Sequence, residues 1–131
     1  PQELIQKYET GTASLEKRME AIQQLLGAGY VVGLRFLPLL PVKNYQNIYQ
    51  LFIKQISNQV DMSQIASTFA SGLLFTKRDY NTILKKYPDL DILHMLELES
   101  DDFYREAREV RTTFYTMFKK LDKKCLLCLE N

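Results

Sequence analysis

Four stretches of the chain carry apolar residues at intervals of three and four, which is the spacing of an amphipathic helix. Three of these helices are expected to begin at Ser14, Asn44 and Thr76, which are good N-caps. The fourth is expected near Asp101, where two acidic residues suit the first turn of a helix. The apolar stripes are Leu15, Met19, Ile22 and Leu26; Tyr45, Ile48, Phe52 and Ile56; Tyr80, Ile83, Leu84 and Tyr87; and Phe103, Ala107, Val110, Phe114, Met117 and Leu121.

Three other stretches have the composition of strands. Residues 30–37 (YVVGLRFL) are rich in β-branched and aromatic side chains and are followed by Pro38, which cannot donate a ladder hydrogen bond. Residues 65–75 and 125–129 are the other two predicted strands, and the small residues within 65–75 leave room for a close neighbour.

The expected order is therefore helix, strand, helix, strand, helix, helix, strand. Such alternation favours an α/β fold with parallel strands. A parallel sheet needs other elements packed on both of its faces, and a parallel sheet of only three strands is small for a complete fold. We therefore predict that residues 1–131 form a single domain, a partial (β/α) barrel fragment with parallel strands and a long C-terminal helix, which is part of something larger.

Composition excludes several classes of protein. The 131 residues include 17 basic and 16 acidic ones, so the net charge of +1 gives no general attraction to nucleic acid or membrane. No apolar run approaches the roughly 20 residues of a membrane-spanning helix, and no signal peptide begins the chain. Two cysteines are too few for a disulfide framework, so we expect a reducing, cytoplasmic compartment.

Few residues suggest metal or acid–base chemistry. Cys125 and Cys128 have the C-x-x-C spacing, but a zinc site needs four ligands and His94 is the one histidine. We interpret the cysteines as small buried residues and His94 as a packed or surface residue. No nucleophile elbow, P-loop or dinucleotide-binding motif occurs.

Two sets of charged residues are candidates for ligand contact. Arg105, Arg108 and Arg111 step by three, so on one helix they would share a side that could meet phosphates or simply face solvent. Arg35 lies inside an apolar predicted strand, and alternation places it on the same face as Leu37. A structural ion pair and a ligand contact in a barrel lumen are both compatible with Arg35.

Residues 8–22 and 28–38, followed in order by several shorter segments, together resemble the spore photoproduct lyase family of radical S-adenosylmethionine (AdoMet) enzymes. Residues 8–22 (YETGTASLEKRMEAI) are similar to the family's YE-x-G-T-x-S-L-x-x-R-x-x-A segment, and residues 28–38 (AGYVVGLRFLP) to the strand that follows it. The shorter matches are residues 73–76 (LLFT), 86–88 (KYP), 103–108 (FYREAR) and 127–130 (LCLE).

The resemblance implies a partial β/α barrel that cleaves AdoMet with a [4Fe–4S] cluster, producing a radical that abstracts hydrogen from a thymine lesion in DNA. The family holds its cluster with a C-x-x-x-C-x-x-C motif in its N-terminal half, and this motif does not occur in the 131 residues. The chain therefore resembles the C-terminal half, which is expected to be inactive without the cluster-binding half.

The resemblance also implies site residues. Leu37 and Pro38, with Arg35 nearby, are the expected AdoMet contacts, and Leu37 stands where the lyases carry alanine. Tyr104, Arg105 and Arg108 are the expected contacts to substrate or to backbone phosphate. Leu74 replaces the arginine of the family's LRFT segment, and the basic hairpin of the lyases is expected to be short or missing across residues 90–102.

Two hypotheses follow. In the first, the chain is part of an enzyme, and its partner is the cluster-binding half. In the second, the half-barrel stands alone as an interaction or nucleic-acid-binding module, and an open sheet face favours self-association. Salt-dependent binding of DNA would support the nucleic-acid version of the second hypothesis.

Overall fold

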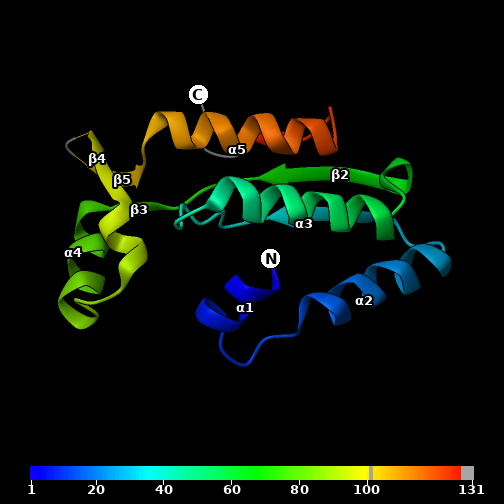
Figure 1. Ribbon diagram of the computed structural model, residues 1–131, viewed down its shortest axis with the longest axis horizontal. Coiled ribbons are helices and arrows are strands. Elements are labelled where there is room, and N and C mark those ends of the chain that lie inside the picture. The colour runs from blue at the N-terminus through cyan, green and yellow to red at the C-terminus, as the bar shows by residue number, and fades with distance from the viewer. Residues whose placement is uncertain (101, 128–131) are drawn as a thin grey trace.

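The computed structural model describes residues 1–100 and 102–127, which form two small sheets and the helices around them (Figure 1). The parallel sheet has the strand order β1-β2-β6 and the antiparallel sheet the order β3-β5-β4. The strands are β1 (Val32–Phe36), β2 (Ile65–Ala70), β3 (Leu74–Thr76), β4 (Leu96–Ser100), β5 (Phe103–Glu106) and β6 (Leu126–Leu127). The helices are α1 (Gln2–Tyr8), α2 (Leu15–Gly27), α3 (Tyr45–Gln59), α4 (Lys77–Lys86) and α5 (Arg108–Leu121), with 3₁₀ turns η1 (Met62–Gln64) and η2 (Asp91–Met95).

The helices α2, α3 and α5 all pack on the same face of the parallel sheet, the one that carries Leu34 and Phe36 of β1. Leu34 of β1 packs in one cluster with Met19 of α2 and Ile56 of α3. Phe118 of α5 is fully buried in the neighbouring cluster, and its ring centroid lies 4.8 Å from that of Phe36. These contacts place the main core between one side of the sheet and its three helices.

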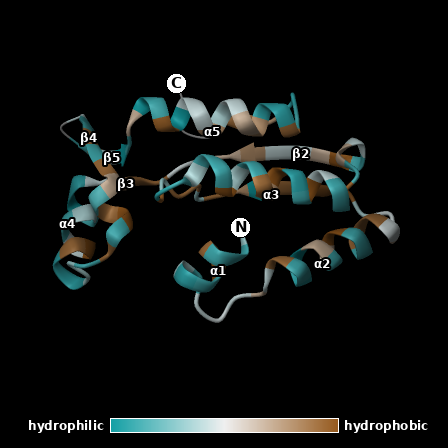
Figure 2. Cartoon of the chain, viewed as in Figure 1, coloured by the Kyte–Doolittle hydropathy of each residue, from teal (hydrophilic) through white to brown (hydrophobic). Residues whose placement is uncertain are grey.

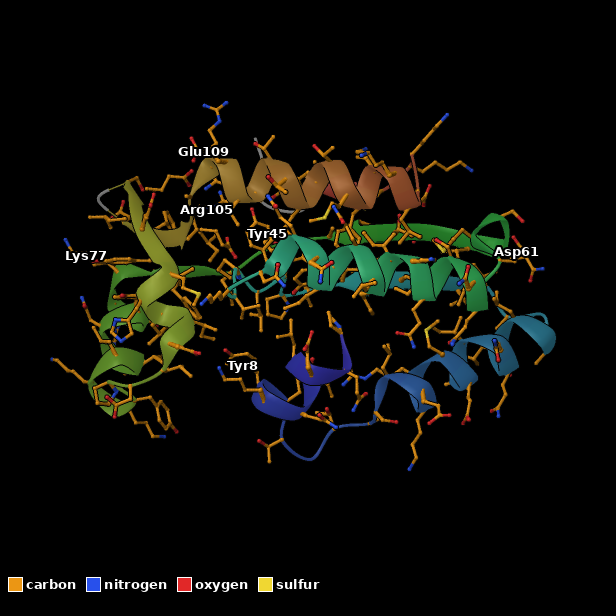
Figure 3. The ribbon with its side chains drawn as sticks, viewed as in Figure 1. Tyr8, Tyr45, Asp61, Lys77, Arg105 and Glu109 are labelled. Carbon is orange, nitrogen blue, oxygen red and sulfur yellow. The ribbon has the colours of Figure 1, made fainter. Side chains whose placement is uncertain are left out.

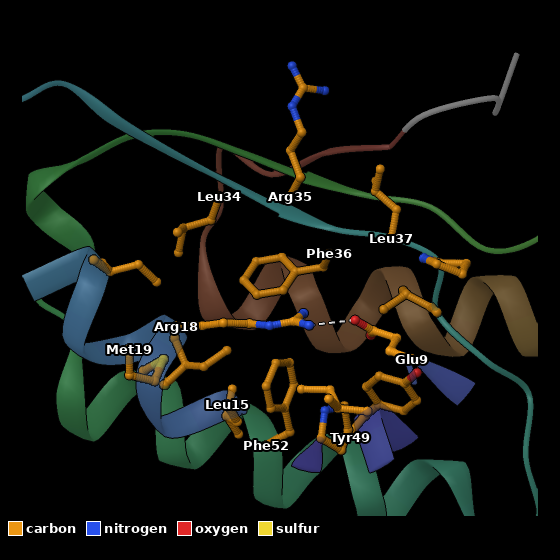
Figure 4. Close-up of a pocket in the computed structure, with 16 residues that line it drawn as sticks. Glu9, Leu15, Arg18, Met19, Leu34, Arg35, Phe36, Leu37, Tyr49 and Phe52 are labelled. Carbon is orange, nitrogen blue, oxygen red and sulfur yellow. Dashed lines mark hydrogen bonds and ion pairs between the residues drawn. The ribbon is translucent and has the colours of Figure 1, made fainter. Parts of the chain in front are cut away.

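The opposite face of the parallel sheet is bare in the part of the chain that the structure describes. Because side chains alternate along a strand, β1 turns Leu34 and Phe36 toward the helices and turns Arg35 and Leu37 away from them (Figure 4). Leu37 is 50% exposed and Leu126 of β6 is 54% exposed. A parallel sheet normally has both faces covered, so the described residues leave one wall of this sheet unpartnered.

The antiparallel sheet packs against α4 through a third cluster. Tyr80 of α4, Leu93 and Leu96 form its buried centre, and the rings of Tyr80 and Tyr104 stack with centroids 3.8 Å apart. Helix α4 is mostly teal with a single brown stretch, as expected of a helix with a narrow buried side (Figure 2). This lobe follows the carboxyl end of β2 in the chain.

The predicted α/β class with parallel strands is confirmed, since β1 and β6 both pair with β2 in parallel. The helix starts at Ser14 and Thr76 are also confirmed, because their side chains accept hydrogen bonds from the backbone N–H groups of Lys17 and Asp79. Among the described residues, no helix is long and apolar enough to cross a membrane.

Three predictions about elements were wrong. Helix α1 was not expected, and the strand expected over residues 65–75 is two strands, interrupted at residues 71–73, that belong to different sheets. The last helix begins at Arg108, because residues Phe103–Glu106 are drawn into β5 by pairing on both sides with β3 and β4. The last strand, expected over residues 125–129, is present as β6 at Leu126–Leu127. Residues 128 and 129, and the expected helix start at Asp101, lie outside the described residues.

Candidate functional site

Arg35 lies on the bare face of the parallel sheet (Figure 4). Its guanidinium stands 4.7 Å from the ring centroid of Phe69 on the neighbouring strand β2. The structure shows no ion pair between Arg35 and a carboxylate of the described residues. Arg35 is exposed and rests on an aromatic ring, so the described part of the chain does not bear out the structural ion pair that the sequence left open.

The end of β1 continues this face. Leu37 and Pro38 are both exposed and are joined by a cis peptide bond. The segment is held to Ser71, the residue after β2, because the Ser71 N–H donates to the Phe36 carbonyl (3.2 Å) and the Leu39 N–H donates to the Ser71 carbonyl (2.8 Å). The structure thus brings together the three predicted AdoMet contacts, at the carboxyl end of a parallel strand, where α/β sheets commonly bind ligands.

The segment that resembles the family's YE-x-G-T-x-S-L-x-x-R motif forms a compact polar cluster (Figure 4). Arg18 pairs with the Glu9 carboxylate at 2.5 Å and also donates to the Thr12 hydroxyl and the Ala13 carbonyl. This cluster lies beside a largely apolar cavity of about 170 Å³ between α1, α2, β1 and α3. Its interactions lie within residues 9–18, so they hold the connection between α1 and α2 in place.

Two of the three predicted phosphate-binding arginines have a different environment from the one expected. Arg105 lies on strand β5 and Arg111 on helix α5, and both are buried and bind the Glu99 carboxylate, at 3.2 and 2.5 Å. The prediction that they share an exposed helix side with Arg108 was therefore wrong. Arg108 is exposed at the start of α5, and Tyr104 is half-buried in its stack with Tyr80.

The region where the hairpin was expected to be short or missing contains a short one. Strands β4 and β5 pair antiparallel, with Leu98 opposite Tyr104. Its sequence over residues 96–106 (LELESDDFYRE) is acidic rather than basic. Leu74, which replaces the arginine of the family's LRFT segment, pairs with Arg105 from the adjacent strand β3.

Glu106 is a buried carboxyl group that the sequence did not single out. It is 1% exposed, and one of its oxygens accepts a hydrogen bond from the Leu73 N–H, while the other has no hydrogen-bond partner among the described residues. Burial raises the pKa of the Glu106 carboxyl, against the opposing effects of the Leu73 N–H and of the nearby arginines.

The contribution of Glu106 to stability is therefore expected to fall as pH rises above about 4.5, where the unfolded carboxyl ionises first and the folded state holds more protons. The loss is at most about 1.4 kcal/mol per pH unit and stops above the raised folded pKa. Glu106→Gln should remove this slope in urea unfolding measured across a pH series, whereas Glu97→Gln, an exposed change in the same hairpin, should keep it. Equal slopes for the wild type and Glu106→Gln would contradict the assignment.

The described residues offer no metal site. No group of three or more His, Cys, Asp or Glu side chains lies together in the part of the chain that the structure describes. His94 is exposed and its Nε2 lies 2.8 Å from the Pro88 carbonyl, and Cys125 is buried at 1% exposure, as predicted for both. Cys128 lies outside the described residues.

Comparisons with known proteins agree with the resemblance. A family model described as spore photoproduct lyase matches residues 2–124. A curated spore photoproduct lyase from Clostridium acetobutylicum is 30% identical over 86 residues, which are 66% of this chain and 25% of that protein.

Solved structures support the fold. A spore photoproduct lyase variant with bound AdoMet and dinucleoside spore photoproduct aligns with a TM-score of 0.65 and 21% identity, covering 89% of this chain and 38% of the other. Another variant, with dinucleoside spore photoproduct, aligns with a TM-score of 0.63 and 20% identity over the same shares. The chain thus spans well under half the length of these relatives, and it belongs to the spore photoproduct lyase family.

Proposed function

We propose that this chain forms the C-terminal part of a cytoplasmic radical AdoMet lyase that repairs a nucleic-acid lesion, working together with a cluster-binding part. In this proposal the bare face of the parallel sheet is the wall of a partial barrel that faces the cofactor. Arg35, Leu37 and Pro38 are the residues that contact AdoMet.

The observation that carries the proposal is the uncovered sheet face. Strand β1 exposes Arg35 and Leu37 there, and β6 exposes Leu126. An exposed apolar surface on a parallel sheet calls for a covering partner, because burying each such side chain contributes about 1.5–3 kcal/mol. A cluster-binding part that completes the barrel would supply this cover.

The residues present are chemically suited to AdoMet but not to the iron–sulfur cluster. The Arg35 guanidinium is a donor for a carboxylate, and Leu37 offers an apolar surface to the nucleoside. The described residues contain no thiolate set for a cluster, so we assign cluster binding to the partner part. Bound AdoMet supplies the radical that starts the reaction, while this chain binds and orients the cofactor.

An alternative is a self-associating module, in which a second copy covers the bare face. The exposed Leu37 and Leu126 favour this as well as they favour a barrel partner. The two alternatives differ in what binds to the face, so one substitution on it can test both.

The expected result is that Leu37→Asp weakens AdoMet binding by about tenfold or more, equivalent to about 1.4 kcal/mol, in the chain combined with the cluster-binding half of a spore photoproduct lyase. Binding is measured by equilibrium dialysis with labelled AdoMet. The matched control is Leu51→Asp, an equally large change at a leucine that is 61% exposed on α3. This control should change the affinity by less than about twofold.

Two outcomes would contradict the proposal. Equal effects of the two substitutions would show that the face carrying Leu37 does not contact AdoMet. An AdoMet-independent dimer of the chain alone, which Leu37→Asp dissociates, would instead favour the self-associating module.

A further inference from the structure

Positive charge is concentrated on one helix of the lobe formed by the antiparallel sheet. Residues 77–87 contain four Lys or Arg residues and one acidic residue, for a net charge of +3. Since the whole chain carries +1, the other residues together carry −2. The near-neutral composition therefore conceals a locally basic segment, which consists of α4 and the residue after it.

The structure places this charge on the outer side of α4. Tyr80 is buried against the sheet, whereas the cations are all exposed, and Lys77 extends outward from the end of the molecule (Figure 3). None of these cations is ion-paired with a carboxylate of the described residues. The one acid, Asp79, accepts a hydrogen bond from the Thr76 hydroxyl at the helix start. The exposed cations are Lys77, Arg78, Lys85 and Lys86.

Their spacing suits a nucleic-acid backbone. Arg78 and Lys85 are seven residues apart, which is about 10.5 Å along a helix. Phosphates of one DNA strand recur about every 3.4 Å along the duplex axis, so the two cations span about three of these steps. Tyr87 is 50% exposed, and the centroid of its ring lies 5.1 Å from the Lys86 ammonium nitrogen. An exposed aromatic ring of this kind can stack on an unpaired base.

The location of α4 also suits this role. The helix follows β2 and β3, so it lies toward the carboxyl end of the parallel sheet, where the proposed cofactor contacts are (Figure 1). Arg105 and Arg111 are buried and paired with Glu99, so neither presents an open cationic surface. The last turn of α5, which carries Lys119 and Lys120, points away from α4 (Figure 1).

We propose that the exposed side of α4, with Lys77, Arg78, Lys85, Lys86 and Tyr87, binds the sugar–phosphate backbone of the nucleic acid beside the lesion. This inference rests on the proposed function, because it assigns the surface that holds the polymeric substrate. Binding of this kind is electrostatic and independent of sequence, so undamaged DNA is a sufficient probe.

The test compares two double variants that remove the same charge from two different helical regions of the chain. Arg78→Gln/Lys85→Gln alters α4, and Lys120→Gln/Lys123→Gln alters the end of α5. Binding of a fluorescent single-stranded oligonucleotide is followed by anisotropy over a range of salt concentrations, and melting curves check that each variant is folded.

The α4 variant should bind about tenfold more weakly than the wild type. The slope of log K against log salt concentration should shrink in magnitude by about 1.4, because two single-strand phosphate contacts are lost. The α5 variant should stay within about twofold of the wild type.

Each other outcome would overturn the inference. Equal losses in the two variants would mean that only net charge matters, and no binding of DNA by the wild type would mean that α4 is an ordinary solvated face. Binding to anionic lipid vesicles but not to DNA would assign α4 to a membrane surface instead. These measurements do not involve AdoMet, so the two tests are independent. A negative result for DNA binding would not contradict the proposed AdoMet contacts, and a negative result for AdoMet binding would not contradict the proposed DNA contacts of α4.

Discussion

Phe118→Ala is expected to destabilise the folded chain by about 3–5 kcal/mol, because it removes a large side chain from the centre of the core. Phe118 is 0% exposed, and its ring lies against Phe36 of the sheet and Tyr49 of α3, with centroids 4.8 and 6.2 Å away. The cavity would open where α5, α3 and β1 meet. Domains of this size have total stabilities of about 5–15 kcal/mol, so the loss is a large share of the whole.

Urea unfolding followed by circular dichroism measures this loss, and the melting temperature should fall by roughly 10–20 °C. Phe118→Leu keeps much of the apolar volume and should cost distinctly less, which provides a folded variant if the alanine variant does not fold. Lys119→Ala, the exposed neighbour, should stay within about 0.5 kcal/mol of the wild type. A cost below about 1 kcal/mol for Phe118→Ala would mean that the packing of α5 on the sheet differs from that described.

The parallel sheet and its covering helices could be predicted because their signals are local. Ser14 and Thr76 cap helices with their own side chains, and residues 30–37 have the composition of a buried strand. The alternation along that strand was enough to place Arg35 and Leu37 on one face, which is the bare face in the structure. What alternation cannot say is which contact Arg35 makes, because Phe69 belongs to a strand more than thirty residues away.

The antiparallel sheet could not be predicted, because a stronger non-local interaction overrides the local pattern. Phe103 has helical spacing with the apolar residues of α5, yet it belongs to a strand that pairs with β3 and β4 on its two sides. Pairing in the middle of a sheet satisfies the backbone of β5 on both edges, which a sequence pattern does not reveal. The same error gave Arg105 an exposed helical position, whereas the structure buries it against Glu99.

The Glu9–Arg18 pair illustrates a further limit. The two residues belong to the segment that resembles the family motif, and the sequence shows them only as parts of that pattern. They meet because the connection between α1 and α2 folds back, so that Arg18 reaches Glu9, Thr12 and Ala13 together. The motif therefore has a structural role in this chain, which its spacing alone could not indicate.

Gly72→Ala is expected to destabilise the chain by about 1–3 kcal/mol, because the added methyl group would collide with the buried Glu106 carboxylate. Gly72 lies in the segment between the two sheets, directly before the Leu73 N–H that donates to Glu106. A carboxylate at the end of an exposed side chain could move away, but Glu106 is 1% exposed and has little room to do so. The new methyl group would therefore weaken the hydrogen bond that joins β5 to the segment between the sheets.

A double-mutant cycle measures this coupling directly. Glu106→Ala alone should cost about 1–3 kcal/mol, because it leaves the Leu73 N–H without its acceptor. In Gly72→Ala/Glu106→Ala the collision is absent, so the double variant should cost less than the sum of the two single variants by at least about 0.5 kcal/mol, measured by urea unfolding. Additive costs would mean that the two residues do not touch in solution. A coupling of the expected sign would show that Gly72 is required at this position because the Glu106 carboxylate occupies the space where a side chain would lie.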